Sequence, residues 1–94
     1  MLRGARVVSW TVVFTPQTQK DARKLKRAGL KPQAEVLLAV LRSNPFAKTP
    51  PYEKLLGDLA GTYSRRITIR HRLVYQVYKK EKVIKVLRMW THYE

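Results

Sequence analysis

The apolar residues of this 94-residue chain change their spacing near position 61, and that change limits the fold more than any other feature of the sequence. Between positions 34 and 41, apolar residues recur at i, i+3, i+4 and i+7, which is the spacing of one buried helix face. From Gly61 onward the period becomes two, which is typical of strands that bury one face. Helices that come early and strands that come late predict an α+β layer fold.

The first two elements are predicted to be a strand and a helix with capping residues at both ends. Residues 10–14 are β-branched and aromatic and predict a strand. Thr15 followed by Pro16 predicts the N-cap and the first position of a helix, because the threonine can accept from an unpaired backbone N–H and the proline lacks one. This helix is expected over residues 17–28, with Gly29 as its left-handed C-cap.

The remaining elements complete a single domain. A second helix is expected from Pro32 to Arg42, and the short connection before it predicts an antiparallel helical hairpin. Prolines make residues 43–52 an extended loop. Three strands are expected after it, over residues 63–69, 73–77 and 83–90. We therefore expect a β-α-α-β-β-β order, with the helical hairpin packed on one face of a mostly antiparallel four-stranded sheet. The expected core includes Leu37, Leu38, Leu41, Ile67, Leu73, Tyr75 and Ile84.

The charge of the chain is strongly unbalanced. Lys and Arg number 20 against 6 Asp and Glu, which gives a net charge of +14 and an isoelectric point near 10.7. Self-repulsion on this scale opposes compaction, so the expected partner is a polyanion or an acidic protein. Part of the excess lies on the exposed face of the first predicted helix, where the cations are opposed only by Asp21, itself expected to be a charge of that face.

Composition excludes several functional classes. The chain has no Cys, which excludes disulfides, thiol chemistry and Cys-ligated zinc, and two His alone would make a weak metal site. We expect no metal and no cofactor. The longest apolar stretch, residues 7–14, is interrupted by Ser9 and Thr11, so no membrane span is expected. Residues 15–19 offer no small-residue cleavage site after that stretch, which favours a cytoplasmic protein.

The few carboxylates and histidines leave one set of residues that could cut RNA without a metal. Such a reaction needs a base for the 2′-hydroxyl, an acid for the 5′-oxygen leaving group and cations for the phosphate. Glu53 and His92 could supply the first two functions, and Arg65 or Arg72 the third. Composition and spacing allow this set without demonstrating it, because on spacing alone a residue such as Glu53 is more often a surface charge and a lone terminal His such as His92 is usually inert.

Four segments carry a more specific pattern. They are Glu-Lys-Leu-Leu-Gly-Asp-Leu-Ala-Gly at 53–61, Tyr-Ser-Arg-Arg-Ile-Thr at 63–68, His-Arg-Leu-Val-Tyr at 71–75 and His-Tyr at 92–93. This pattern resembles the YoeB/Txe toxins, a branch of the RelE superfamily of bacterial toxin–antitoxin modules. The resemblance covers roughly residues 10–93, so we expect one toxin domain over residues 10–94 and an N-terminal extension over residues 1–9.

The resemblance implies a ribosome-dependent endoribonuclease that cuts mRNA in the ribosomal A site and is silenced by a YefM-like antitoxin. Position by position, Glu53 matches the family's general base, His92 its general acid and Arg72 the arginine that stabilises the scissile phosphate. Tyr93 matches the aromatic residue that helps to orient that phosphate. The basic residues expected near the RNA substrate are Lys54, Arg65 and Arg66.

The cations of the first predicted helix are assigned to the ribosome. Because ribosomal RNA is a polyanion, we expect them to add affinity without taking part in chemistry. They are Lys20, Arg23, Lys24, Lys26 and Arg27. The sequence leaves the state of the free protein open between a monomer and a homodimer.

Two other functions are compatible with parts of the sequence. A basic RNA- or ribosome-binding module without chemistry would account for the charge and would stack bases on aromatic residues of the strands. The candidates for stacking are Tyr63, Tyr75, Tyr78 and Trp90. A pure binder needs neither Glu53 nor His92, so these two residues separate it from the nuclease. An antitoxin-like DNA-binding regulator is disfavoured, because the sequence has no helix-turn-helix pattern.

Overall fold

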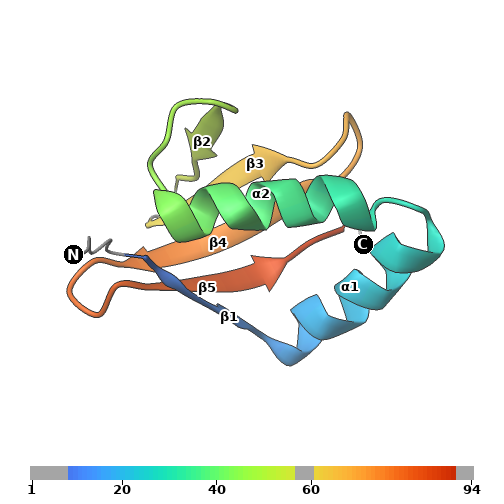
Figure 1. Cartoon of the computed structure of the whole chain (residues 1–94), viewed down its shortest axis with the longest axis horizontal. Coiled ribbons are helices and arrows are strands. Elements are labelled where there is room, and N and C mark those ends of the chain that lie inside the picture. The colour runs from blue at the N-terminus through green and yellow to red at the C-terminus, as the bar shows by residue number, and fades with distance from the viewer. Residues whose placement is uncertain (1–8, 57–60, 91–94) are drawn as a thin grey trace, which may run out of the picture.

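The structure is a computed structural model that describes residues 9–56 and 61–90. Within those residues it has the predicted α+β class, with two helices and a sheet (Figure 1). The elements are β1 (Thr11–Phe14), α1 (Pro16–Arg27), α2 (Lys31–Ser43), β2 (Tyr52–Lys54), β3 (Thr62–Arg66), β4 (Arg72–Tyr78) and β5 (Val83–Arg88). Neither of these two helices, the ones in the described part of the chain, is long and apolar enough to cross a membrane.

The sheet has five strands rather than the predicted four, in the order β1-β5-β4-β3-β2. β1 and β5 run parallel and the other pairs run antiparallel, so the expectation of a mostly antiparallel sheet is confirmed. The additional strand is β2, which begins at the last residue of the predicted loop. Its three residues show no alternation of apolar and polar side chains, and they become a strand through their pairing with β3.

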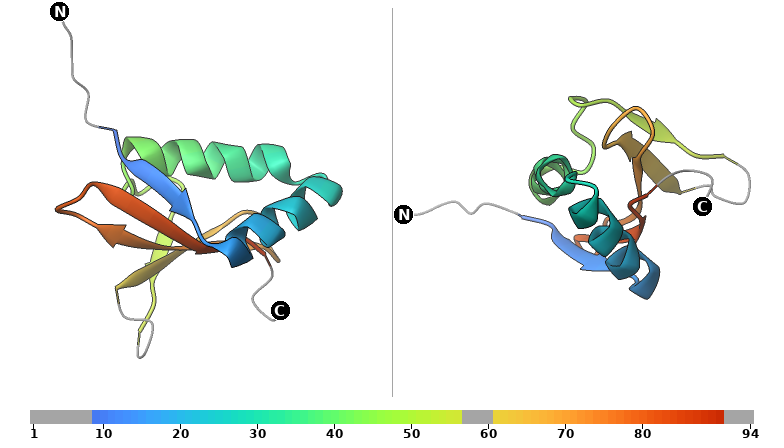
Figure 2. Two further views of the ribbon diagram at one scale, coloured as in Figure 1. Left: turned by 90° about the horizontal axis from the view of Figure 1, so that it is seen from below. Right: turned by 90° about the vertical axis from the view of Figure 1, so that its right-hand side faces the viewer.

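The two helices begin and end close to the predicted positions. The Thr15 side chain accepts the Thr18 N–H at 3.1 Å, and Pro16 occupies the first position of α1. Gly29 follows the helix with a φ of 74°, a conformation that glycine adopts at little cost. From this turn the two helices diverge (Figures 1 and 2), so the predicted hairpin is an open V.

One apolar core forms where α2 lies over a face of the sheet (Figure 2). Leu41 of α2 is fully buried, as are Leu73 and Tyr75 of β4. The other predicted core residues belong to the same cluster, and Ile67 is the most exposed of them at 9%. The predicted core is therefore confirmed, and the face of β4 that carries Leu73 is the inner face of the sheet.

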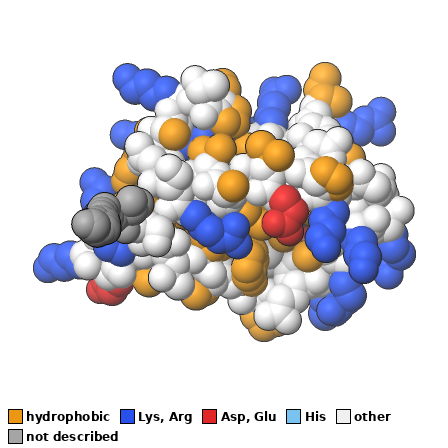
Figure 3. All heavy atoms as spheres, in the orientation of Figure 1, with side chains coloured by type: hydrophobic (Ala, Val, Ile, Leu, Met, Phe, Trp, Pro, Cys, Tyr) orange, Lys and Arg blue, Asp and Glu red, His pale blue; other side chains and the backbone are white. Residues whose placement is uncertain are grey.

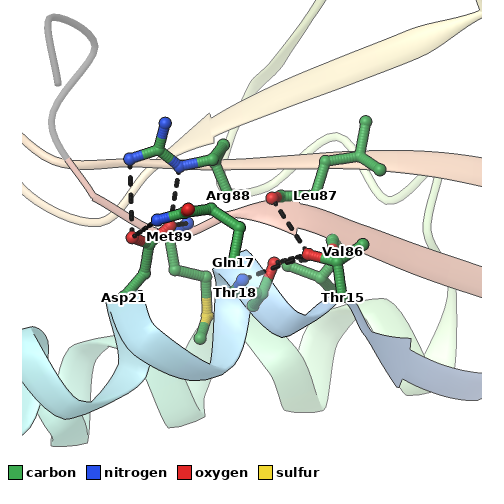
Figure 4. A network of polar contacts seen from close by, with 8 residues as sticks. All are labelled: Thr15, Gln17, Thr18, Asp21, Val86, Leu87, Arg88 and Met89. Atoms are coloured by element: carbon green, nitrogen blue, oxygen red, sulfur yellow. Dashed lines mark hydrogen bonds and ion pairs between the residues drawn. The ribbon is translucent and has the colours of Figure 1, made fainter.

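The polar network of Figure 4 fastens α1 to the end of β5. Asp21, expected on an exposed helix face, is instead fully buried. Its carboxylate accepts from Arg88 Nε at 2.8 Å, from the Met89 N–H at 3.0 Å and from Gln17 Nε2 at 3.0 Å. Burial raises the pKa of Asp21, but these hydrogen bonds outweigh it and hold the pKa below its ordinary value of 3.8. The sequence prediction was wrong here because two of these partners lie far along the chain.

Candidate active site

Strand alternation brings four polar residues to one face of β2, β3 and β4. Glu53 lies opposite Ser64 in the β2–β3 pair, and Arg66 lies opposite Arg72 in the β3–β4 pair. Ser64 and Arg66 are two residues apart on β3, so both side chains leave the same face of that strand. This face is opposite the apolar core, because Leu73, the neighbour of Arg72 on β4, points into the core.

These four residues line a pocket of about 280 Å3, together with Pro50 and Pro51. Arg72 Nη1 donates to Glu53 Oε1 at 3.0 Å, so an ion pair links β2 to β4. The Glu53 side chain is 68% exposed and the Arg72 side chain 26%. An exposed carboxylate can accept a proton, and neighbouring guanidinium groups can bind an anion. Cleavage of a phosphodiester by a neighbouring hydroxyl uses both functions. In residues 9–56 and 61–90, no three His, Asp or Glu side chains gather as metal ligands.

Ser64 is a pocket residue that the sequence did not single out for a function. It is 3% exposed, and its hydroxyl oxygen is buried without a hydrogen-bond partner in the described part of the chain. Its spacing of two from Arg66 was the signal that could have placed it on the pocket face. Ser64 therefore forms part of the pocket wall beside the Glu53–Arg72 pair.

Arg65 lies outside this pocket, and its burial is incompatible with the predicted contact to RNA. It is 1% exposed and leaves the core side of β3, opposite Leu73. Its Nε donates to the Tyr75 hydroxyl at 3.0 Å, and its Nη atoms donate to backbone carbonyls of the loop before β2. All three nitrogens of the guanidinium are thus occupied inside the protein.

Among the described residues, Lys54 is a further predicted site residue, and it does not line the pocket. Lys54 is exposed and follows Glu53 directly on β2, so the two side chains leave opposite faces of the strand. His92 and Tyr93 lie outside the described residues. The carbonyl of Trp90 accepts the Arg72 N–H at 3.0 Å. The last described residue is therefore hydrogen-bonded to the strand that carries Arg72.

The predicted ribosome-binding cations lie on α1, away from the pocket. Lys24 is half-buried, with its Nζ 5.8 Å from the centre of the Trp90 ring. Arg23 and Lys26 line a groove of about 200 Å3 between α1 and α2. The exposed members of the set are Lys20, Arg23, Lys26 and Arg27. Figure 3 shows Lys and Arg side chains gathered over the part of the molecule where α1 lies in Figure 1.

The aromatic residues named for base stacking mostly pack inside the protein. Tyr75 is fully buried, and Tyr63 stacks on it with ring centres 5.7 Å apart. Trp90 is half-buried and makes an edge contact to His71, with ring centres 4.7 Å apart. Tyr78 is the exposed member of the four. Because internal packing accounts for most of these rings, they give little support to an RNA-binding module without chemistry.

Comparisons with known proteins identify a family of similar sequences. A family model described as the YoeB-like toxin of bacterial type II toxin–antitoxin systems matches residues 14–93. Toxin YoeB of Synechocystis is 34% identical over 76 residues, which are 81% of this chain and 79% of that protein. The match includes all the pocket residues on β2, β3 and β4.

Solved structures show the same arrangement. A YoeB/ParE toxin from Agrobacterium tumefaciens matches with a TM-score of 0.80 at 33% identity, over 88% of this chain and 99% of that chain. A YoeB–YefM complex from Staphylococcus aureus matches with a TM-score of 0.75 at 32% identity, over 95% of this chain and 100% of that chain. A YoeB dimer from the same organism matches with a TM-score of 0.71 at 31% identity, over 89% and 98%.

Proposed function

Because the chain belongs to the family of YoeB-like toxins of bacterial type II toxin–antitoxin systems, we propose that it is a ribosome-dependent endoribonuclease that cuts mRNA in the ribosomal A site. YoeB and RelE toxins are ribonucleases, so membership supports nuclease activity in general. Cleavage in the A site would inhibit translation. The observation that carries the proposal is the pair of Glu53 and Arg72, 3.0 Å apart in an open pocket.

Glu53 is the general base in this mechanism. Its exposed carboxylate accepts the proton of the 2′-hydroxyl, and the 2′-oxygen then attacks the adjacent phosphorus in line. A new O–P bond forms, and the phosphorane carries more negative charge than the ground-state phosphodiester. Arg72, with Arg66 in the same pocket, stabilises that charge as it develops.

His92 is the general acid, and Tyr93 helps to orient the scissile phosphate. The bond from phosphorus to the 5′-oxygen breaks as that oxygen takes a proton from His92, which leaves a 2′,3′-cyclic phosphate and a 5′-hydroxyl. Hydrolysis of the cyclic phosphate would give a 3′-phosphate. The assignment is supported by Trp90, which precedes His92 by two residues and is hydrogen-bonded to Arg72. The mechanism requires no metal, because the nucleophile belongs to the substrate and the arginines supply the positive charge.

The proposal includes a YefM-like antitoxin that binds and silences the protein. It is supported by the S. aureus structure, in which YoeB is in complex with YefM. The charge of +14 would attract an acidic segment of such a partner and steer its association. A homodimer of the free protein is proposed on similar grounds, since the S. aureus YoeB has been solved as a dimer.

Single-turnover cleavage of mRNA on programmed ribosomes tests the mechanism. Glu53→Gln removes the base and should lower the cleavage rate by about 10²–10⁴. Glu81→Gln is the matched control, because it removes one exposed carboxylate from the turn between β4 and β5. An mRNA with a 2′-deoxy nucleotide at the cleavage position should resist the wild-type protein, because the nucleophile is missing.

Ribosome binding is measured on the same samples. Cleavage of the 2′-deoxy mRNA, or a Glu53→Gln variant that cuts at the wild-type rate, would contradict the mechanism. Ribosome binding by the wild-type protein with no cleavage of any mRNA would favour the binding module without chemistry.

A further inference from the structure

Arg65 is a buried cation with which no carboxylate pairs in the described part of the chain. Its guanidinium instead gathers oxygen atoms from one loop. Nη2 donates to the carbonyls of Pro45 and Ala47 at 2.9 and 2.8 Å, and Nη1 donates to the carbonyl of Pro50. Nε donates to the Tyr75 hydroxyl, which in turn donates to the Pro45 carbonyl at 3.2 Å. One side chain therefore holds the loop of residues 45–50 at three points.

This loop leads directly into β2. Tyr52, the first residue of β2, lies opposite Arg65 in the strand pairing, and its ring centre is 5.0 Å from the guanidinium carbon. Phe46, inside the loop, contacts the ring of Tyr52 edge-on with ring centres 6.5 Å apart. Arg65 thus fixes the loop and also the residue that comes immediately before Glu53.

Glu53 depends on this anchor more than a residue of a central strand would. β2 has three residues and lies at the edge of the sheet, where β3 is its neighbour. We propose that Arg65 is a positioning residue for Glu53: it holds β2 through the loop of residues 45–50 and through Tyr52, and it does not contact RNA. This rests on the proposed role of Glu53 as the general base.

The geometry explains why the position requires an arginine. The donors of a guanidinium point in fixed directions within one plane, and here its three nitrogens reach four acceptors. A lysine carries one compact ammonium group, which cannot reach the same acceptors together. Arg65→Lys therefore keeps the charge but loses the planar set of guanidinium donors. Tyr75→Phe removes one hydroxyl from the network and keeps the aromatic ring.

Hydrogen exchange of the β2 amides is a readout that does not depend on activity. In Arg65→Lys, the Glu53 and Leu55 amides, which face β3, should exchange roughly tenfold faster or more, while β4 and β5 keep their protection. Tyr75→Phe should change the same amides in the same direction by a smaller factor. Ile84→Ala, a truncation in the core on β5, is the control and should lower protection across the sheet without selecting β2. Unchanged exchange of the Glu53 and Leu55 amides in Arg65→Lys and in Tyr75→Phe would overturn the proposal.

Cleavage kinetics separate a positioning role from a merely structural one. Arg65→Lys should lower kcat by about 10-fold to 100-fold through misplacement of the base. KM should stay near the wild-type value, because Arg65 is buried and offers RNA no contact. In a Glu53→Gln background, Arg65→Lys should cause no further loss of rate, because the residue that it positions is already inactive.

The two kinds of failure are distinguishable. Losses of rate that multiply in the Arg65→Lys/Glu53→Gln double variant would overturn the positioning role. A Glu53→Gln variant that cuts at the wild-type rate would instead overturn the proposed nuclease mechanism. In that case the exchange of the β2 amides still decides whether Arg65 holds this strand.

Discussion

On the core side of β3, Arg65 is 1% exposed and donates to loop carbonyls, whereas on the opposite side the next residue, Arg66, is exposed and lines the pocket. The two side chains separate because consecutive residues of a strand face opposite sides. Both residues carry the same group, but the hydrogen-bonding atoms of Arg65 are used up inside the fold. The positive charge of this protein therefore divides into a part that holds the structure and a part that a ligand can reach.

Among the carboxylates, Asp21 is the counterpart of Arg65, because it is a buried charge held inside the fold. It is fully buried, and it accepts hydrogen bonds from Arg88, from the Met89 N–H and from Gln17. A buried charge is tolerated when its polar atoms are satisfied in this way. Glu53 differs from Asp21 in its exposure to solvent. Its side chain is 68% exposed, and the side chain of its ion-pair partner Arg72 is itself 26% exposed.

The largest expected effects come from truncating one arginine of each kind, and they should fall on different quantities. Arg65→Ala should lower the free energy of unfolding by about 1–3 kcal/mol for each carbonyl left without a donor. Arg72→Ala should lower it by less than about 1 kcal/mol, because it breaks one partly exposed ion pair. The cleavage rate of Arg72→Ala should nevertheless fall by roughly 10²–10³, since the charge on the phosphorane loses its stabiliser. Urea unfolding and single-turnover cleavage measure the two quantities.

Arg42→Ala, which removes an exposed arginine from the last turn of α2, is the control for both measurements. It should leave stability and cleavage close to their wild-type values. The assignment of Arg72 to the site and Arg65 to the structure would be contradicted if Arg72→Ala lost several kcal/mol of stability. The same assignment would be contradicted if Arg65→Ala were as stable as the wild-type protein.

Local patterns predicted those parts of the fold that neighbouring residues decide. The stripe at positions 34–41, the N-cap at Thr15 and the left-handed Gly29 each depend on residues within one or two helical turns, and the structure confirms all three. β2 could not be predicted in this way, because its sequence Tyr-Glu-Lys has no apolar alternation. It is a strand because β3 lies beside it, and that is a property of the tertiary structure.

The candidate site was predictable to a similar extent. The resemblance placed Glu53 and Arg72 together, and the structure pairs their side chains. The position of Arg65 was not predictable, because its acceptors include three loop carbonyls and every residue type has a carbonyl. Asp21 was missed for a related reason, since one of its donors is the backbone N–H of Met89.

A smaller effect is expected from Asp21 in acid. Because the native pKa of Asp21 lies below 3.8, its hydrogen bonds contribute stability that is complete above that value and is lost as the pH falls through the native pKa. Asp21→Asn should remove a slope of up to about 1.4 kcal/mol per pH unit from the acid side of the stability profile. Urea unfolding at a series of pH values measures this slope. Glu35→Gln, at an exposed carboxylate of α2, should leave this slope unchanged. An Asp21→Asn variant with the wild-type acid profile would contradict the stabilisation of charged Asp21 by the hydrogen bonds drawn in Figure 4.

The smallest effect for each residue is expected from the exposed cations of α1, which lie outside the pocket. If each contacts one phosphate of ribosomal RNA, its replacement by Gln should reduce the slope of log affinity against log salt concentration by roughly 0.7–0.9. The residues to replace, singly and together, are Lys20, Arg23, Lys26 and Arg27. Cleavage by the ribosome-bound variant should proceed at the wild-type rate, because these charges do not touch the reacting atoms. Lys80→Gln, on the turn between β4 and β5, is the control of equal charge. A variant with all four substitutions that keeps the wild-type affinity and salt slope would show that these charges do not bind the ribosome. They would then serve the antitoxin or solubility, and the accessible cations would have different partners on α1 and in the pocket.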